Sequence, residues 1–135
     1  MSKVPFVDEV EEFNHTMGKP NNYKPTIPKR KEWQFVYDFV LEELEEYREA
    51  CERGDIVEIL DALCDITYVS LGNGAMLHGL KDKVWPAYQE VQASNMSKSC
   101  SDEIKVSRLY LTSEINKIIK YSNSALPPDF RWQCF

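Results

Sequence analysis

The sequence predicts an all-α fold, a bundle of helices in a single domain. Apolar residues recur at three- and four-residue steps over residues 33–51, as one face of a helix requires. A second segment, which begins near Ile56, is apolar on almost every side, and a third near residues 82–94 repeats the helical spacing. With 43% hydrophobic residues, a chain of 135 residues can form one core without disulfides or a metal. We therefore expect residues 1–135 to form one domain.

Residues 1–31 predict a short helix followed by an extended arm. The helix covers roughly residues 7–17 and ends at the Gly-Lys-Pro sequence of residues 18–20. The arm, residues 21–31, contains two prolines, which remove backbone donors and disfavour a helix. We expect this arm to lie over the rest of the domain.

Residues 32–98 contain the predicted catalytic helices. The first runs from about residue 32 to residue 52 and is closed by Gly54, while Asp55 is suited to cap the second helix. Because the second helix has little purely polar surface, we expect it to be central and buried. Its Gly-Asn-Gly sequence favours a kink or a close helix contact, and Gly79 is expected to end the segment.

Residues 99–135 form a C-terminal extension whose structure is harder to predict. The stretch 115–121 fits either a strand or a short helix, and its pattern does not decide between them. Residues 126–129, Leu-Pro-Pro-Asp, predict a tail that lies on the surface.

Composition and charge exclude several classes of protein. The net charge of −6 removes the basic footprint of a general nucleic-acid binder. No stretch approaches the roughly 18 apolar residues of a membrane span, and the N-terminus lacks the basic-then-apolar order of a secretory signal. We therefore expect a cytoplasmic protein without nucleic-acid or membrane partners. The four cysteines are far apart and form no C-x-x-C pair, so the sequence does not support a zinc site.

Half of all the acids lie in one stretch of 28 residues that holds only two bases. On a helical wheel of about 100° per residue, Glu43 and Glu46 of the first catalytic helix flank its apolar stripe, and Glu42 lies beside them. Glu45 and Glu49 point elsewhere, as is typical of a solvated surface.

On the second catalytic helix, Glu58, Asp61 and Asp65 form one stripe that they share with apolar residues. Unpaired carboxylates on a buried helix are costly, and only Arg48 and Arg53 lie nearby in the sequence to neutralise them. A divalent cation would resolve this conflict, and oxygen ligands without His or Cys indicate Mg²⁺ or Mn²⁺ rather than zinc. The alternative is a polar seam satisfied by arginines and water. A di-iron bundle is disfavoured because it needs two Glu-x-x-His motifs, and one occurs.

These acids fall into recognisable motifs. Glu42-Glu43-Leu44-Glu45-Glu46 is an E-E-x-x-E motif, and Glu58-Ile59-Leu60-Asp61 is an E-x-x-D motif that follows after eleven residues. The pair resembles the signature of the MazG-like all-α NTP pyrophosphohydrolases. The later run Ser94-Asn95-Met96-Ser97-Lys98 is similar to the branch described as phosphoribosyl-ATP pyrophosphohydrolase-like. The resemblance covers nearly the whole chain, with residues 99–116 as the unmatched segment.

The resemblance implies a helical protomer that assembles as a homodimer or a dimer of dimers. It also implies cleavage of a nucleoside triphosphate between the α and β phosphates, which gives a monophosphate and pyrophosphate. By resemblance, four carboxylates hold Mg²⁺, for which Mn²⁺ is a substitute, and the ions bridge phosphate oxygens: Glu43, Glu46, Glu58 and Asp61. Glu42 is the carboxylate expected to orient or deprotonate the attacking water.

The resemblance further implies substrate contacts outside the metal site. Lys98 would offset the triphosphate charge and Asn95 would donate to a phosphate or sugar oxygen, while the alternative is a helix C-cap followed by a solvated lysine. The other residues assigned to substrate binding are Asp65, Tyr68, Phe13 and Asn14.

The expected substrate is a deoxypyrimidine triphosphate, dUTP or dCTP, with a role in nucleotide-pool house-cleaning. An aromatic surface and an amide assembled from the arm suit a small base slightly better than a purine. Two alternatives remain open, namely phosphoribosyl-ATP as the substrate and a non-catalytic nucleotide-binding module on the same scaffold.

Overall fold

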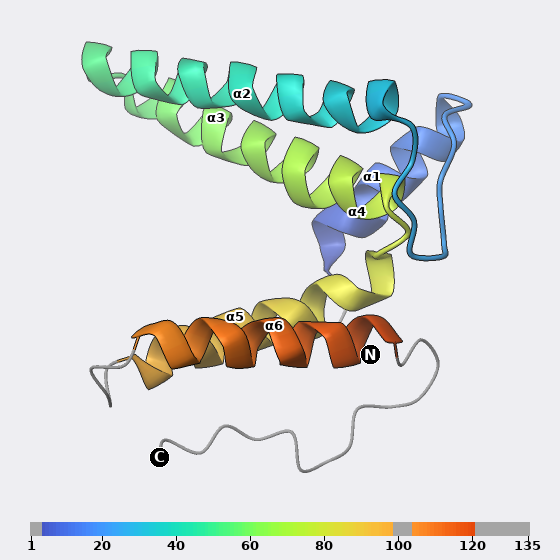
Figure 1. Ribbon diagram of the computed structural model, residues 1–135. Coiled ribbons are helices and arrows are strands. Elements are labelled where there is room, and N and C mark those ends of the chain that lie inside the picture. The colour runs from blue at the N-terminus through green and yellow to red at the C-terminus, as the bar shows by residue number, and fades with distance from the viewer. Residues whose placement is uncertain (1–3, 99–103, 121–135) are drawn as a thin grey trace. The chain divides into compact units, whose positions relative to one another are not determined.

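The computed structural model describes residues 4–98 and 104–120 (Figure 1). These residues are largely helical and contain no strand, which confirms the predicted all-α fold class. Within them, no helix has the length and the apolar character needed to cross a membrane. The chain divides into two compact units, Met1–Lys81 and Asp82–Phe135, which are called unit 1 and unit 2. The expectation of one domain stays a prediction.

Unit 1 contains an antiparallel helical hairpin. Helix α2, Arg30–Arg53, packs along helix α3, Ile56–Thr67 (Figure 1). Gly54 ends α2 in a left-handed conformation with a φ of 70°, which glycine adopts at little steric cost. Asp55 then caps α3, because its Oδ1 accepts hydrogen bonds of 3.2 Å from two backbone N–H groups of the first turn. Both the predicted stop and the predicted cap are confirmed.

The helix changes its geometry after α3. A π-helical turn, Tyr68–Asn73, leads into the short helix α4, Gly74–Leu77. This turn packs against helix α1, Pro5–Thr16. At the contact, a Cβ atom on Gly72 would overlap Cγ2 of Val10. The glycine-rich sequence therefore permits the close helix contact that it predicts.

The arm between α1 and α2 is extended and is hydrogen-bonded to the end of α4. The backbone N–H of Asn22 donates to the carbonyl of Met76, and that of Thr26 donates to the carbonyl of His78, both at 3.0 Å. The side-chain amide of Asn22 donates to the carbonyl of Leu77 at 2.6 Å. The predicted position of the arm over the rest of the chain is confirmed for unit 1.

Gly79, which follows α4, packs closely against the backbone of the arm. Its φ is 67°, and a Cβ atom there would overlap the backbone of Lys24. We expect Gly79→Ala to destabilise the protein by about 3 kcal/mol or more, since a backbone clash adds to the left-handed strain. Gly18→Ala is the matched control, because Gly18 has a φ of 65° but open space around it.

Gly18→Ala introduces the left-handed strain without a clash, so we expect it to lower the free energy of unfolding by about 1–2 kcal/mol. Urea unfolding of the two variants and the wild type measures both losses. Equal losses for the two variants would contradict the clash at Gly79.

The buried core of unit 1 lies where α1 meets the π-helical turn and α4. Val7, Val10 and Met76 are at most 1% exposed there. The prediction of a buried second helix holds for the residues of the π-helical turn and α4, but it is wrong for α3 in the protomer, because only one side of α3 is covered by α2. Four apolar side chains of α3 are between 45% and 74% exposed: Ile56, Val57, Leu60 and Leu63.

In the part of unit 2 that the structure describes, helix α5, Val84–Ser97, packs against helix α6, Ile104–Lys120. A short 3₁₀ turn, Lys81–Lys83, precedes α5, so the predicted third helix exists and begins slightly later than expected. The stretch 115–121 is helical as far as residue 120, which decides between the two alternatives. The predicted tail at residues 126–129 lies outside the described residues.

Candidate active site

Carboxylates from α2 and α3 gather around Glu43. The Glu43 side chain is partly buried, and its Oε2 is buried without a hydrogen-bond partner. Desolvation raises the pKa of Glu43 above its ordinary value, and four negative charges raise it further: in decreasing order Asp65, Glu46, Glu42 and Asp61. The antiparallel packing of α2 on α3 thus concentrates negative charge from both helices at one place.

The structure brings together most of the carboxylates that the sequence predicts for the site. Glu42, Glu46 and Asp61 are exposed and act on Glu43 through their charges. Glu58 lies in the first turn of α3, where its side chain is exposed. Asp65, which we assigned to substrate binding, has the largest charge effect on Glu43, so it belongs to the same cluster. Its spacing of one helical turn from Asp61 is the sequence signal for this placement.

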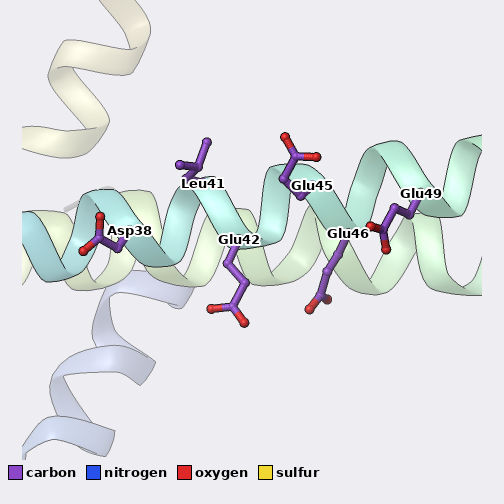
Figure 2. A pocket seen from close by; sticks show the side chains of 6 residues that line it. All are labelled: Asp38, Leu41, Glu42, Glu45, Glu46 and Glu49. Carbon is purple, nitrogen blue, oxygen red and sulfur yellow. The ribbon is translucent and has the colours of Figure 1, made fainter.

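A hollow on the outer side of α2 is lined mainly by acidic residues (Figure 2). Figure 2 shows Glu42 and Glu46 pointing to the same side of the helix, with Leu41 and Glu45 on the other side. Glu49 also lines this hollow, as does Asp38. Glu49 is therefore not separate from Glu42 and Glu46 as the sequence analysis expects, because it follows Glu42 by seven residues, nearly two helical turns, and lies on the same face.

The donor set suits a hard divalent cation, although the side chains do not form a preformed cage. Over residues 4–98 and the described part of α6, no three His, Cys, Asp or Glu side chains are placed to hold a metal ion. Two observations nevertheless favour a cation at this position, the unpartnered Oε2 of Glu43 and the crowding of like charges around it. Oxygen ligands without His or Cys select Mg²⁺ or Mn²⁺.

An aromatic pair lies at the contact between α1 and the π-helical turn. The rings of Phe13 and Tyr68 meet edge to face, with centroids 6.2 Å apart and planes at 80°. The Phe13 side chain is 41% exposed, and Nζ of Lys19 lies 5.2 Å from its ring centroid. The sequence analysis missed Lys19, although its position directly after the end of α1 places it close to Phe13. The pair offers a partly exposed ring on which a base can stack.

Asn14 is tied into the protein rather than presented to a ligand. It is 6% exposed, and its Nδ2 donates to Oδ1 of Asn21 at 2.9 Å. The Nδ2 of Asn21 in turn donates to the carbonyl of Glu11 at 3.2 Å. These bonds fasten the arm to α1. The expected role of Asn14 in reading a base edge stays a prediction that these contacts do not favour.

Asn95 and Lys98 belong to unit 2. Lys98 is the C-cap residue that follows α5, and its Nζ donates to Oδ1 of Asn95 at 3.0 Å. Both side chains are exposed, and Asn95 lies within the helix rather than capping it. Their role in binding phosphate stays a prediction.

A family model described as phosphoribosyl-ATP pyrophosphohydrolase matches residues 10–95 of the chain. The matched range includes α2, α3 and the whole acidic cluster, as well as Phe13 and Tyr68. Comparisons with curated proteins and with solved structures gave no match.

Proposed function

Because the chain belongs to the phosphoribosyl-ATP pyrophosphohydrolase family of the MazG-like all-α NTP pyrophosphohydrolases, we propose Mg²⁺-dependent hydrolysis of a nucleoside triphosphate as its reaction. The general activity, nucleotide pyrophosphohydrolysis, follows from the family. The observation that supports the metal is the crowding of carboxylates around the unpartnered Oε2 of Glu43. Because the chain belongs to a family of pyrophosphohydrolases, we favour an active enzyme over a non-catalytic nucleotide-binding module.

In the proposed reaction the bond between the α and β phosphates is hydrolysed to a monophosphate and pyrophosphate. Mg²⁺ supplies neutralisation of the negative phosphate oxygens. The residues proposed to hold it are Glu43, Glu46, Glu58 and Asp61. Glu42 is exposed beside Glu46 in the hollow of α2, where its carboxylate can orient or deprotonate the attacking water.

For the substrate we propose a deoxypyrimidine triphosphate, dUTP or dCTP. The triphosphate is common to all candidates, so the base must be selected by groups outside the acidic cluster. The Phe13 ring, partly exposed against Tyr68, provides one small stacking surface, which suits a small base. The name of the matched family supports phosphoribosyl-ATP as a second candidate.

Catalytic efficiencies with Mg²⁺ decide between these substrates. The panel is dUTP, dCTP, dATP, dGTP, the matching ribonucleotides and phosphoribosyl-ATP. We expect kcat/KM for dUTP or dCTP to exceed the others by about tenfold. Phe13→Leu should lower this preference, whereas Phe35→Leu, which alters another exposed ring, serves as the matched control. A purine preference of about tenfold would overturn the choice of base, and phosphoribosyl-ATP as the best substrate would establish the second candidate.

We also propose that the chain assembles as a homodimer or a dimer of dimers through the apolar outer face of the hairpin. Exposed apolar side chains from both helices form this face: Tyr37, Leu41 and Leu44 of α2, and Ile56, Leu60 and Leu63 of α3. Exposed large apolar side chains on two neighbouring helices are typical of the interfaces of permanent homodimers.

Light scattering at micromolar concentration is expected to give at least twice the 15.7 kDa mass of one chain. Leu60→Asp should shift the protein toward the monomer, because it places a charge in the apolar face. Ile27→Asp, on the arm, replaces a residue that is 87% exposed and should leave the mass unchanged. A wild-type mass near that of a single chain would contradict the assembly.

A further inference from the structure

Two carboxylates are buried between α5 and α6 of unit 2. Glu90 on α5 is 4% exposed, and Glu114 on α6 is 3% exposed. Nζ of Lys117, one helical turn further along α6, donates to Oε1 of Glu114 at 2.6 Å. The Oε2 of Glu90 is buried without a hydrogen-bond partner. The contact between the two helices therefore contains a carboxyl group whose polar atom is left unsatisfied.

The charges at this contact do not balance when both carboxyl groups are ionised. Among the α6 side chains that the structure describes, residues 111–120, the charged groups that act on Glu90 are Glu114 and Lys117. The ammonium of Lys117 is hydrogen-bonded to Glu114, and its side chain is 53% exposed to water, which screens its charge. An ionised Glu90 is thus desolvated and is repelled by the negative charge of Glu114, which is an unfavourable arrangement.

We propose that the α5–α6 contact is a proton-controlled clamp, in which α6 packs firmly on α5 when Glu90 is protonated and loosens when Glu90 is ionised. This inference concerns unit 2 and does not depend on the proposed reaction. A protonated carboxyl group has no charge to desolvate, and it can also donate a hydrogen bond. Protonation therefore removes the cause of the imbalance without a change in packing.

The direction of the pH effect follows from the pKa of Glu90. Desolvation raises this pKa above the ordinary 4.5, the negative charge of Glu114 raises it further, and Lys117 lowers it less. The packed state therefore binds the proton more tightly than the loosened state does. The stabilising contribution is complete below the ordinary carboxyl pKa, and it is lost as the pH rises through the raised pKa of the packed state.

Hydrogen exchange of the full-length protein between about pH 5 and pH 8, a range above the ordinary carboxyl pKa, tests the clamp. The protection of amides in residues 111–120, corrected for intrinsic exchange, should fall roughly tenfold relative to amides of α1, the size expected for an unsatisfied buried polar group. Glu90→Gln keeps the shape and removes the charge, so this fall should disappear. Glu114→Gln should make the fall smaller, and Glu12→Gln on α1 is the control without effect.

Glu90→Gln introduces a buried amide, which can itself disturb the contact between α5 and α6. A second variant, Glu90→Met, avoids this problem. It removes both the charge and the unsatisfied oxygen, so its α6 protection should also be independent of pH. An unchanged pH profile in Glu90→Gln and Glu90→Met would overturn the proposal. The same holds for a wild type in which the amides of α6 and α1 respond to pH alike.

Discussion

Glu46→Gln and Asp61→Asn are each expected to lower kcat by on the order of 10²-fold or more, because a site that loses one anionic ligand loses several kcal/mol of charge stabilisation. Both carboxylates act on Glu43 through their charges, one from α2 and the other from α3. The two substitutions keep the shape of the side chain, so the loss reports on charge rather than on packing. Steady-state kinetics with saturating Mg²⁺ measures the effect.

Glu49→Gln is the control, and it is a demanding one. Glu49 lines the same hollow as Glu46, one helical turn away, yet we do not assign it to the metal (Figure 2). We expect Glu49→Gln to leave kcat almost unchanged. If Glu49→Gln lowers kcat as much as the other two substitutions do, the assignment of helix faces is wrong and the hollow itself is the better candidate for the metal site.

Removal of the divalent metal is expected to abolish activity and to lower thermal stability. Without a cation, the charge of Glu43 lies partly buried beside four other carboxylates, which raise its pKa and destabilise its ionised form. Mg²⁺ should raise the melting temperature of the wild type by on the order of a few degrees. Glu43→Gln should raise the melting temperature measured in chelator, should lose most of the response to Mg²⁺, and should be inactive.

Glu52→Gln provides the comparison, because Glu52 is an exposed residue near the end of α2. It should melt and respond to Mg²⁺ as the wild type does. A wild type whose melting temperature is the same in Mg²⁺ and in chelator would contradict a metal at this cluster. If Mg²⁺ raises the melting temperature of Glu43→Gln as much as that of the wild type, Glu43 does not have the central place in the cluster.

Local signals made the boundaries of the hairpin predictable. Gly54 is a residue that tolerates a left-handed conformation, and Asp55 has a side chain that reaches the free N–H groups of the next helix. Both effects depend on neighbours within a few residues, so the sequence contains all the information. The extended arm was predictable for the same reason, because proline disfavours a helix wherever it occurs in its interior.

Features that depend on distant partners were not predictable. The π-helical turn at Tyr68–Asn73 packs against α1; the glycines predict a kink or a close contact there, but the sequence alone does not identify α1 as the partner. The apolar pattern of α3 predicts burial, but it does not say whether a neighbouring helix of the same chain or of another copy provides the cover. Within the protomer α2 covers one side of α3, and Leu60 is 63% exposed.

The site shows the same division between local and distant information. Helical spacing was enough to place Glu43 and Glu46 beside the apolar stripe and to align Asp61 with Asp65. The hydrogen bond from Asn14 to Asn21 joins α1 to the arm, and it depends on how the chain turns back between them. Spacing along one helix does not contain that information, so an amide expected at the substrate turned out to be fastened inside the protein.

Our central claim is that the protein hydrolyses a nucleoside triphosphate to a monophosphate and pyrophosphate, with a metal ion held by the carboxylates of α2 and α3. Its most direct test is to identify the first products formed from a nucleoside triphosphate in the presence of Mg²⁺, with the products separated by chromatography. We predict nucleoside monophosphate and pyrophosphate in equal amounts, and no product in excess chelator. Orthophosphate as the first product, or undiminished activity in excess chelator, would contradict the claim.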